Sequence, residues 1–378
     1  MPRTIPAAVT TKMPAYRVLY NFAGTPDGAR PEAVLLYVTG TFYGATFYGG
    51  TYGKGTVFSL TKDGAEKVLH SFAGGNDGAE PASSLIDVDG TLYGTTYYGG
   101  PYNRGTVFSM QTTGAERVLH SFGNGSDGQT PNAGLIDVHG TLYGTTEVGG
   151  GPNWGTVFAI GPMRGSIGEH IVYAFTGFSG GIPTSSLLYV KGAFYGTTRF
   201  GGSYGRPSGG DGVVFRVTAK GAETVLHDFG NGTDGSQPNA SLIDVKGTLY
   251  GTTQTGGRYA SGDAGGVVFS ITTHGEEHVL HDFGAGSDGA YPWAGLLDLG
   301  GTLYGTTYEG GAYNDGIVFA MSTAGIERVL HGFSGRPDGS EPSANLIAVD
   351  GTLYGTTFLG GNGGSSKLGA GAVFSLRP

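Results

Sequence analysis

The sequence contains no cysteine, which excludes a disulfide framework and a thiolate metal site. Only 13% of its 378 residues are charged and the net charge is −9, with no cluster of Lys and Arg. Because binding to phosphates needs a basic surface, we expect no nucleic-acid partner. No apolar run approaches the roughly 20 residues that cross a membrane, so we expect no membrane span. Apolar residues also lack helical periodicity throughout, which favours an all-β fold.

Glycine, in contrast, is abundant: the chain has 76, and they recur at fixed places without the three-residue period of collagen. Fixed positions indicate required backbone geometry and not a flexible linker. The hydrophobic content of 38%, with 22 Tyr and 20 Phe, supplies a core and excludes general disorder. Residues 1–14 lack the apolar middle of a signal peptide, so no export signal is visible. We expect them to form a disordered tail, and residues 15–378 to form one domain.

A seven-residue motif, G-T-L-Y-G-T-T, organises the chain. It begins at Gly90, Gly140, Gly247, Gly301 and Gly351, and looser copies begin at residues 40 and 192. Its tyrosines are residues 43, 93, 143, 195, 250, 304 and 354, so the period is 50–55 residues. Seven copies at such a period predict a repeat architecture.

The second repeat serves as the template for local structure. Residues 84–88, 91–97, 105–110 and 116–122 read as four antiparallel strands, and Asp89-Gly90 suits a two-residue type I′ hairpin turn. Four-stranded units of about 40–50 residues are typical of β-propeller blades. The chain ends on a third strand (371–376) and begins with an isolated fourth strand (16–22). The sequence therefore predicts a seven-bladed β-propeller of four-stranded antiparallel blades, closed by the N-terminal strand completing the last blade.

Three motifs follow one another in each repeat: G-T-L-Y-G-T-T, then G-G-x-x-x-x-G-T-V-F, then V-L-H-x-F. Together they resemble the GloVer (Gloeo/Verruco) tandem repeats of extracellular bacterial proteins, over about residues 15–376. The resemblance implies a secreted or surface-exposed repeat protein, so we expect an extracellular or periplasmic location. Such proteins often carry separate sorting anchors, and none is visible here. The resemblance brings no catalytic residues.

One Asp recurs in the link between repeats, in the pattern F-x-x-x-x-D-G. We expect its carboxylate to bond loop N–H groups and hold the turn, so no cofactor and no metal is expected. Calcium is the alternative, because Asn, Ser and Asp oxygens lie close together in links such as G-N-G-S-D-G. The candidates for it are Asp127, Asp234 and Asp288. The His of V-L-H-x-F also recurs and is interpreted as a packing residue, since a catalytic His is needed only once.

Candidate functional residues lie where the repeats differ. Turns between first and second and between third and fourth strands are short and share one face, whereas the second-to-third loops and the blade links share the other. On that long-loop face, the positions after G-T-T and beside the link prolines vary while the frame does not, which indicates recognition. The predicted ligand-binding residues combine aromatic, amide and charged side chains: Tyr97, Glu147, Trp154, Arg199, Gln254, Tyr291, Trp293 and Tyr308.

Such a combination suits sugars, because aromatic rings stack on sugar CH faces and polar groups bind hydroxyls. It equally suits a protein partner. Our first hypothesis is therefore an extracellular propeller that binds a polysaccharide, an oligosaccharide or a protein, and we expect a monomer. The second is a carbohydrate-active enzyme. A hydrolase would use a carboxylate pair from Glu32, Glu80 and Glu341, or Glu147 with Asp211, and a lyase would use Arg199 with Tyr204. The third is a structural surface protein without a small ligand.

Overall fold

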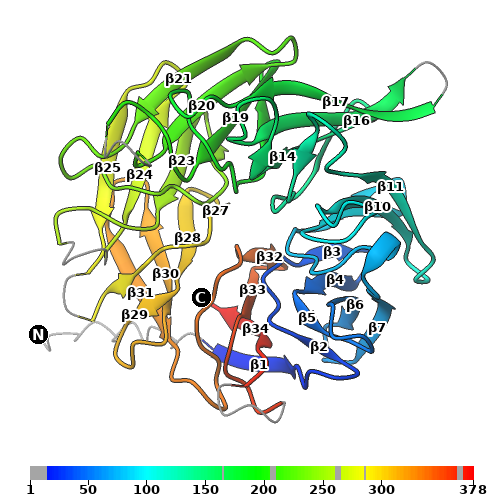
Figure 1. Ribbon diagram of the computed structural model, residues 1–378. Coiled ribbons are helices and arrows are strands. Elements are labelled where there is room, and N and C mark those ends of the chain that lie inside the picture. Colours follow the sequence, from blue (N-terminus) through cyan, green and yellow to red (C-terminus); the bar gives the residue numbers. More distant parts are fainter. Residues whose placement is uncertain (1–14, 164–165, 205–209, 260–264, 285–286, 364–368) are drawn as a thin grey trace, which may run out of the picture.

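The computed structural model describes residues 15–163, 166–204, 210–259, 265–284, 287–363 and 369–378. The tail expected at residues 1–14 lies outside the described residues. Seven four-stranded antiparallel sheets stand in a ring (Figure 1), so the prediction of a seven-bladed β-propeller is confirmed. The described residues are almost free of helix, with one short 3₁₀ turn, η1 (Gly75–Asp77).

Each blade runs from a short inner strand to a longer outer one. Blade one holds β3 (Leu36–Val38), β4 (Thr41–Thr46), β6 (Thr56–Thr61) and β7 (Glu66–Ser71). Blade two holds β8 (Ile86–Val88), β9 (Thr91–Thr96), β10 (Thr106–Gln111) and β11 (Glu116–Ser121). Blade three holds β13 (Ile136–Val138), β14 (Thr141–Thr146), β16 (Thr156–Met163) and β17 (Ser166–Ala174). Blade four holds β18 (Leu188–Val190), β19 (Ala193–Thr198), β20 (Val213–Thr218) and β21 (Glu223–Asp228).

The remaining blades follow the same order. Blade five holds β22 (Ile243–Val245), β23 (Thr248–Thr253), β24 (Val267–Thr272) and β25 (Glu277–Asp282). Blade six holds β27 (Leu297–Leu299), β28 (Thr302–Thr307), β30 (Ile317–Ser322) and β31 (Glu327–Gly332). Blade seven holds β32 (Ile347–Val349), β33 (Thr352–Thr357), β34 (Ala372–Arg377) and, from the other end of the chain, β1 (Ala15–Asn21).

The ring closes as the sequence predicts. β1, dark blue in Figure 1, pairs antiparallel with the red C-terminal strand β34, from Ala15 opposite Arg377 to Asn21 opposite Ala372. The N–H of Phe22 continues the pairing by donating to the carbonyl of Gly371 at 3.0 Å. Blade seven therefore receives its outer strand from the N-terminus, and β34 is paired on both of its edges.

The first hairpin of each blade also has the predicted turn chemistry. In blade two, Asp89 and Gly90 have φ values of 51° and 81°, and the six equivalent pairs are also positive at both residues. A type I′ turn requires positive φ at both central residues, which is why an x-Gly pair recurs there.

The core lies between adjacent blades. A phenylalanine just after the outer strand of each blade packs against the third-strand phenylalanine of the next, with ring centroids 5.0–5.4 Å apart at all seven junctions. Phe22 and Phe58 form this pair between blades seven and one. Burial of these rings joins each blade to its neighbour, so the blades depend on one another for stability.

Links and loops also pair, which the sequence did not predict. Two-residue strands in three links pair with the second-to-third loops of the blades they enter: β2 (Gly28–Ala29) with β5 (Tyr48–Gly49), β12 (Gly128–Gln129) with β15 (Val148–Gly149), and β26 (Gly289–Ala290) with β29 (Glu309–Gly310). Single bridges take the same place in the other four blades, at Ala79–Tyr98, Gly181–Phe200, Ser236–Thr255 and Ser340–Leu359. The variable segments of the long-loop face are therefore hydrogen-bonded into the frame.

Candidate functional site

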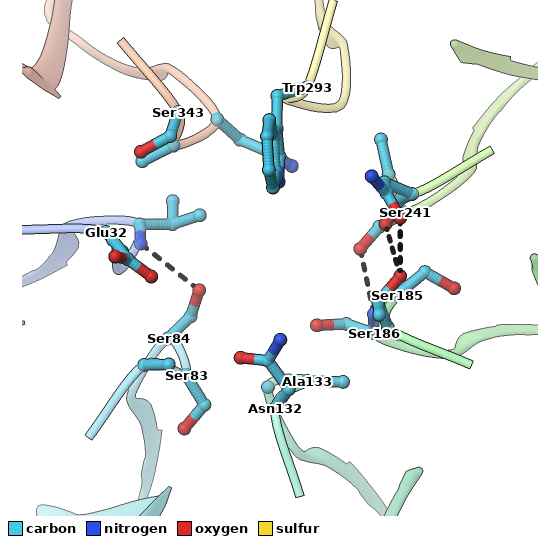
Figure 2. A pocket seen from close by; sticks show the side chains of 18 of the residues that line it. Glu32, Ser83, Ser84, Asn132, Ala133, Ser185, Ser186, Ser241, Trp293 and Ser343 are labelled. Carbon is cyan, nitrogen blue, oxygen red and sulfur yellow. Dashed lines mark hydrogen bonds between the residues drawn. The ribbon is translucent and has the colours of Figure 1, made fainter. Parts of the chain in front are cut away.

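A cavity of about 550 Å³ occupies the centre of the ring, and all seven blades line it. Figure 2 shows side chains from the blade links converging on this space. Two sequence positions supply most of the lining at its mouth. The first is the residue after each link proline: Glu32, Ala82, Asn132, Thr184, Asn239, Trp293 and Ser343. The second is the residue after the G-T-T motif, which contributes Glu147, Arg199, Tyr308 and Phe358.

A third set of lining residues lies three positions after each proline and was missed from sequence. Ser84, Ser186 and Ser241 belong to it and point inward in Figure 2. The Ser84 hydroxyl accepts a bond from the Val34 N–H at 3.3 Å, and the Ser241 hydroxyl one from the Ser186 N–H at 3.0 Å. The sequence did carry a signal for this set: each link repeats the pattern P-x-[A/S]-x-L, and the second variable position of that pattern is the lining residue. These hydroxyls join neighbouring blades beside the cavity.

The backbone holds the mouth residues in place through the residue before each link proline. In blade three this residue, Thr130, has a φ of 53°, and its N–H donates to the Arg104 carbonyl of blade two at 2.8 Å. Its own carbonyl accepts from the N–H of Glu147 at 3.1 Å. All seven blades repeat both bonds and the positive φ. Left-handed non-glycine residues persist only where their surroundings fix them, so the mouth is a rigid platform for variable side chains.

Glu147 is the centre of a polar sector formed by blades two to four. Its Oε2 accepts from the Tyr97 hydroxyl and its Oε1 from the Asn132 amide, each at 2.8 Å. Burial raises the pKa of the Glu147 carboxyl, and the two hydrogen bonds and the Arg199 charge oppose that rise. Burial also lowers the pKa of the Arg199 guanidinium, whose Nε lies buried without a hydrogen-bond partner in the structure. The sector therefore holds a fixed acceptor beside a cation that retains an unused donor.

The polar sector continues into blades four and five. The Asn239 amide donates to the Gln254 side-chain oxygen at 2.7 Å, and the Thr184 hydroxyl donates to the Asn239 side-chain oxygen at 3.1 Å. Because Asn239 and Gln254 are both buried, their orientation is fixed by these partners. Gln254 does not line the cavity; it acts through Asn239, which does.

An aromatic arc faces this sector from blades six, seven, one and two. Trp293 packs against Tyr308 in a tilted arrangement with ring centroids 5.3 Å apart, and the Tyr308 ring lies 6.4 Å from that of Phe358. The Arg30 guanidinium continues the arc, 4.8 Å from the Phe358 centroid and 5.1 Å from that of Tyr48. Phe47 and Tyr97 extend it to the edge of blade two. The Tyr308 hydroxyl donates to Glu341 at 2.6 Å, which fixes the ring.

Glu32 is the acidic residue with the most perturbed environment at the mouth. Burial raises the pKa of its carboxyl to about 7, the Glu80 charge adds to the rise, and the Arg30 charge opposes it. Glu32 lines the cavity between Ser343 of blade seven and Ser84 of blade two (Figure 2). A carboxyl that titrates near neutrality can both donate and accept a proton.

The structure thus brings together Glu32, Glu147, Arg199, Trp293 and Tyr308 as lining residues of one cavity. Tyr97 and Glu341 lie behind them as hydrogen-bond partners of Glu147 and Tyr308. Gln254 lies behind the lining residue Asn239, and Glu80 acts on Glu32 through its charge. The other predicted residues contribute differently. Tyr291 supplies backbone bonds as the residue before a link proline.

Three further predicted residues, Trp154, Tyr204 and Asp211, also lie outside the cavity lining. Trp154 packs over Gly177 and Gly181, where an added Cβ would come within 3.0 and 2.3 Å of the indole, so it is a loop-packing residue. Tyr204 is 48% exposed, at a loop position where four other blades also expose a tyrosine (Tyr52, Tyr102, Tyr259 and Tyr313). Asp211 lies against Gly230 and accepts the Gln237 N–H at its carbonyl. The pairing of Arg199 with Tyr204, and that of Glu147 with Asp211, therefore lack a shared cavity.

The recurrent Asp residues of the links make the turn contacts expected of them. Asp127 Oδ2 accepts from the Gly123 N–H at 3.2 Å and bonds His120 Nε2 at 3.1 Å. Asp234 and Asp288 bond His227 and His281 in the same way. These three calcium candidates belong to the outer part of the blades and do not line the central cavity.

Within the described residues, no helix has the length and apolarity that crossing a membrane requires.

Known proteins resemble this chain in fold. The structure superposes on virginiamycin B lyase from Staphylococcus aureus with a TM-score of 0.58 and 13% identity, covering 97% of this chain and 99% of that one. It superposes on quinohemoprotein alcohol dehydrogenase from Comamonas testosteroni with a TM-score of 0.55 and 12% identity, covering 97% and 76%. At such identities the likeness shows the fold alone. No curated protein matches the sequence.

The sequence itself matches a family model, the Gloeobacter/Verrucomicrobia repeat, over residues 8–209 and 205–378. The match spans nearly the whole chain and agrees with the repeat motifs and the seven blades that they form. The chain belongs to the Gloeobacter/Verrucomicrobia repeat family.

Proposed function

We propose that this propeller is an extracellular binding protein that holds a carbohydrate at the mouth of its central cavity. One observation carries the proposal: the mouth is divided into an aromatic arc and a polar sector, although the backbone beneath it repeats seven times. A sugar ring has the same division, with apolar CH faces and hydroxyls at its edge. Trp293 and Tyr308 supply the stacking surface, and Asn132, Asn239 and Arg199 the hydrogen-bonding groups.

The size and rigidity of the site support this assignment. A cavity of about 550 Å³ is within the range of small-molecule sites, roughly 300–1,000 Å³. Fixed side chains lose little conformational entropy on binding, which matters for sugars because each of their hydrogen bonds replaces one to water. The hydrogen bonds from Tyr97 to Glu147 and from Tyr308 to Glu341 provide this preorganisation.

The test is binding of oligosaccharides on a glycan array, followed by calorimetry on those retained. Trp293→Ala and Arg199→Ala are expected to weaken binding at least tenfold, or about 1.4 kcal/mol, because each removes one side of the site. Ile326→Ala is the matched control: Ile326 is 76% exposed, in the turn between β30 and β31 and outside the cavity lining. Equal loss in all three variants, or retention of no glycan, would contradict carbohydrate binding and favour a protein partner or a purely structural role.

A second candidate function, a carbohydrate-active enzyme, is favoured by Glu32 alone. Its carboxyl has a pKa raised to about 7 and faces the cavity, as a general acid at neutral pH requires. Glu147, the other acidic lining residue described, is two blades away, with Ala82 of blade two between them. The test is a product assay on pooled polysaccharides: shortened products that disappear in Glu32→Gln would establish turnover, whereas retention without products would leave a binding protein.

A further inference from the structure

Six blade junctions share an unusual carboxylate. The first residue of the outer strand, or its equivalent near the start of β17, is a Glu that faces the preceding blade. One oxygen of each is buried without a hydrogen-bond partner: Oε1 of Glu66, Glu116, Glu169, Glu223, Glu277 and Glu327. A buried polar atom left unpaired costs about 1–3 kcal/mol, and more when the group is charged. The same uncompensated cost at six equivalent places requires an explanation.

The junction between blades two and three is the most complete of these. Glu169 of blade three faces His120 and Asp127 of blade two, and ligand atoms of all three lie within 4.8 Å of one another. Asp127 is only 8% exposed. Its Oδ2 takes both hydrogen bonds, from His120 and the Gly123 N–H, so its Oδ1 is buried with no partner. Two buried, unpartnered carboxylate oxygens therefore lie beside an imidazole where the two blades meet.

The charges at this junction oppose one another. Burial raises the pKa of the Glu169 carboxyl to about 7, the nearby Asp127 charge adds to the rise, and His120 reduces it. Either a proton or a cation placed among these groups removes the cost. His120 is held edge-on against Phe122 at a centroid distance of 4.6 Å, and Asp127 is oriented by the Gly123 N–H. Ligands that are fixed by outer contacts in this way are typical of metal sites.

We propose that the junction of His120, Asp127 and Glu169 binds a divalent cation of the zinc class, as does the equivalent junction of His70, Asp77 and Glu116. The second junction meets the same spacing, with ligand atoms within 4.8 Å of one another and His70 Nε2 3.1 Å from Asp77 Oδ1. One imidazole nitrogen with two carboxylates suits zinc and other transition metals, whereas calcium takes six to eight oxygens. Such a cation differs from calcium, the alternative considered for the link oxygens, and bridges two blades.

The chain contains its own control junction. Between blades three and four, Tyr173 stands where His120 stands in blade two. Ser179 takes the Asp place of the link, because its hydroxyl accepts from the Thr176 N–H at 3.2 Å as Asp127 accepts from the Gly123 N–H. Glu223 is still present there, with its Oε2 accepting from Tyr173 at 3.4 Å. This junction keeps the buried glutamate but lacks the nitrogen and second carboxylate, so it is expected to bind no cation.

The experiment is calorimetric titration of ZnCl₂ into tag-free protein stripped with EDTA and dialysed, with CoCl₂ as a spectroscopic probe. Wild-type protein is expected to bind two equivalents with the ligand set proposed here, and Co²⁺ to give the visible absorption of a nitrogen- and oxygen-ligated site. Glu169→Gln is expected to weaken one site at least tenfold. Glu223→Gln is expected to leave stoichiometry and affinity unchanged. Gln preserves the size of Glu, and the melting temperature in EDTA verifies that each variant is folded.

Three outcomes would overturn the proposal. One is no binding of Zn²⁺ or Co²⁺ at millimolar concentration, which would leave a shared proton as the occupant of these junctions. Another is equal loss of binding in Glu169→Gln and Glu223→Gln. The third is binding that survives both Glu169→Gln and Glu116→Gln, which would place the metal elsewhere. A second variant, His120→Asn, protects the test against misfolding of the first, because it removes the nitrogen ligand and the cobalt absorption of that one site while leaving both of its carboxylates.

Discussion

A substitution at Phe22 tests, with a single side chain, whether the N-terminal strand closes the ring. It follows β1, is completely buried, and packs against Phe58 of blade one with ring centroids 5.1 Å apart. Six other phenylalanines occupy the equivalent place at the other junctions and are also fully buried: Phe72, Phe122, Phe175, Phe229, Phe283 and Phe333. If the N-terminal strand is a full member of blade seven, Phe22→Ala must lower the free energy of unfolding as much as the same change in the middle of the chain.

The expected cost follows from the burial. Replacing a fully buried Phe by Ala costs about 3–5 kcal/mol, from lost transfer free energy and the cavity left behind. An unfolding entropy of about 2.1 cal/mol/K per residue gives roughly 0.8 kcal/mol/K for a domain of this size, so a loss of 4 kcal/mol lowers the melting temperature by about 5 °C. Phe122, whose ring is 5.0 Å from Phe158, is the matched control.

The assay is urea unfolding and calorimetry of wild type, Phe22→Ala and Phe122→Ala. The free energy of unfolding of both variants is expected to fall by similar amounts, about 3–5 kcal/mol. Removing residues 1–22 should destabilise the protein more than either point variant, since it exposes the edge of β34. A Phe22 variant within 1 kcal/mol of wild type beside a strongly destabilised Phe122 variant would refute the closure argument.

Three other measurements test the frame and the site. Gly94→Val should destabilise the protein by more than the roughly 1–3 kcal/mol of ordinary overpacking, because even a Cβ there would lie 2.7 Å from Phe108 and 2.8 Å from Leu85; a neutral effect in urea unfolding would contradict this. In EDTA, the melting temperature should rise from pH 8 to pH 5. Burial raises the pKa of the junction carboxyls Glu66, Glu116 and Glu169 to about 7, so their protonation stabilises the folded state. This stabilisation is complete below their ordinary pKa and is lost as the pH rises towards 7. A flat profile would show that other groups dominate. Trp293→Ala should leave the melting temperature within about 1 °C of wild type, because Trp293 is 37% exposed at the mouth; a large fall would assign it to the frame.

The architecture could be predicted from the sequence because every repeat carries the same pattern of strands and turns. A single G-T-L-Y-G-T-T would be an ambiguous strand, but seven at a 50–55-residue period leave few folds, and the unpaired strands at the two ends specify closure. The role of Gly94 could not be read from the sequence. Its close neighbours Phe108 and Leu85 belong to its own blade, so it permits packing within blade two, and Phe108 in turn packs against Phe72 of blade one.

The site was only partly predictable, because sequence shows which positions vary but not where a variable side chain points. Trp154 and Trp293 both interrupt the repeat, yet the first covers two glycines of a link and the second lines the cavity. Their loops differ in kind: Trp293 follows a link proline, whose backbone is fixed by bonds to two blades, whereas Trp154 lies in a second-to-third loop. The junction carboxylates were missed for another reason. Their partners lie about 40 residues away in the preceding blade, and a regular Glu on an outer strand reads as a solvent-exposed residue.

The contrast between a sevenfold frame and an uneven mouth bears on function. The left-handed residue before each link proline makes the same two backbone bonds in all blades, so selection on folding alone has no reason to distinguish the residue after the proline in one blade from that in another. Yet the residues after the prolines are acidic, small, amide or indole in different blades, and the aromatic mouth residues Trp293, Tyr308 and Phe358 are contiguous in blades six and seven. A partner with sevenfold symmetry would need the same side chain seven times. Segregated aromatic and polar groups instead match a ligand that is smaller than the ring, has two unlike sides, and binds off its axis.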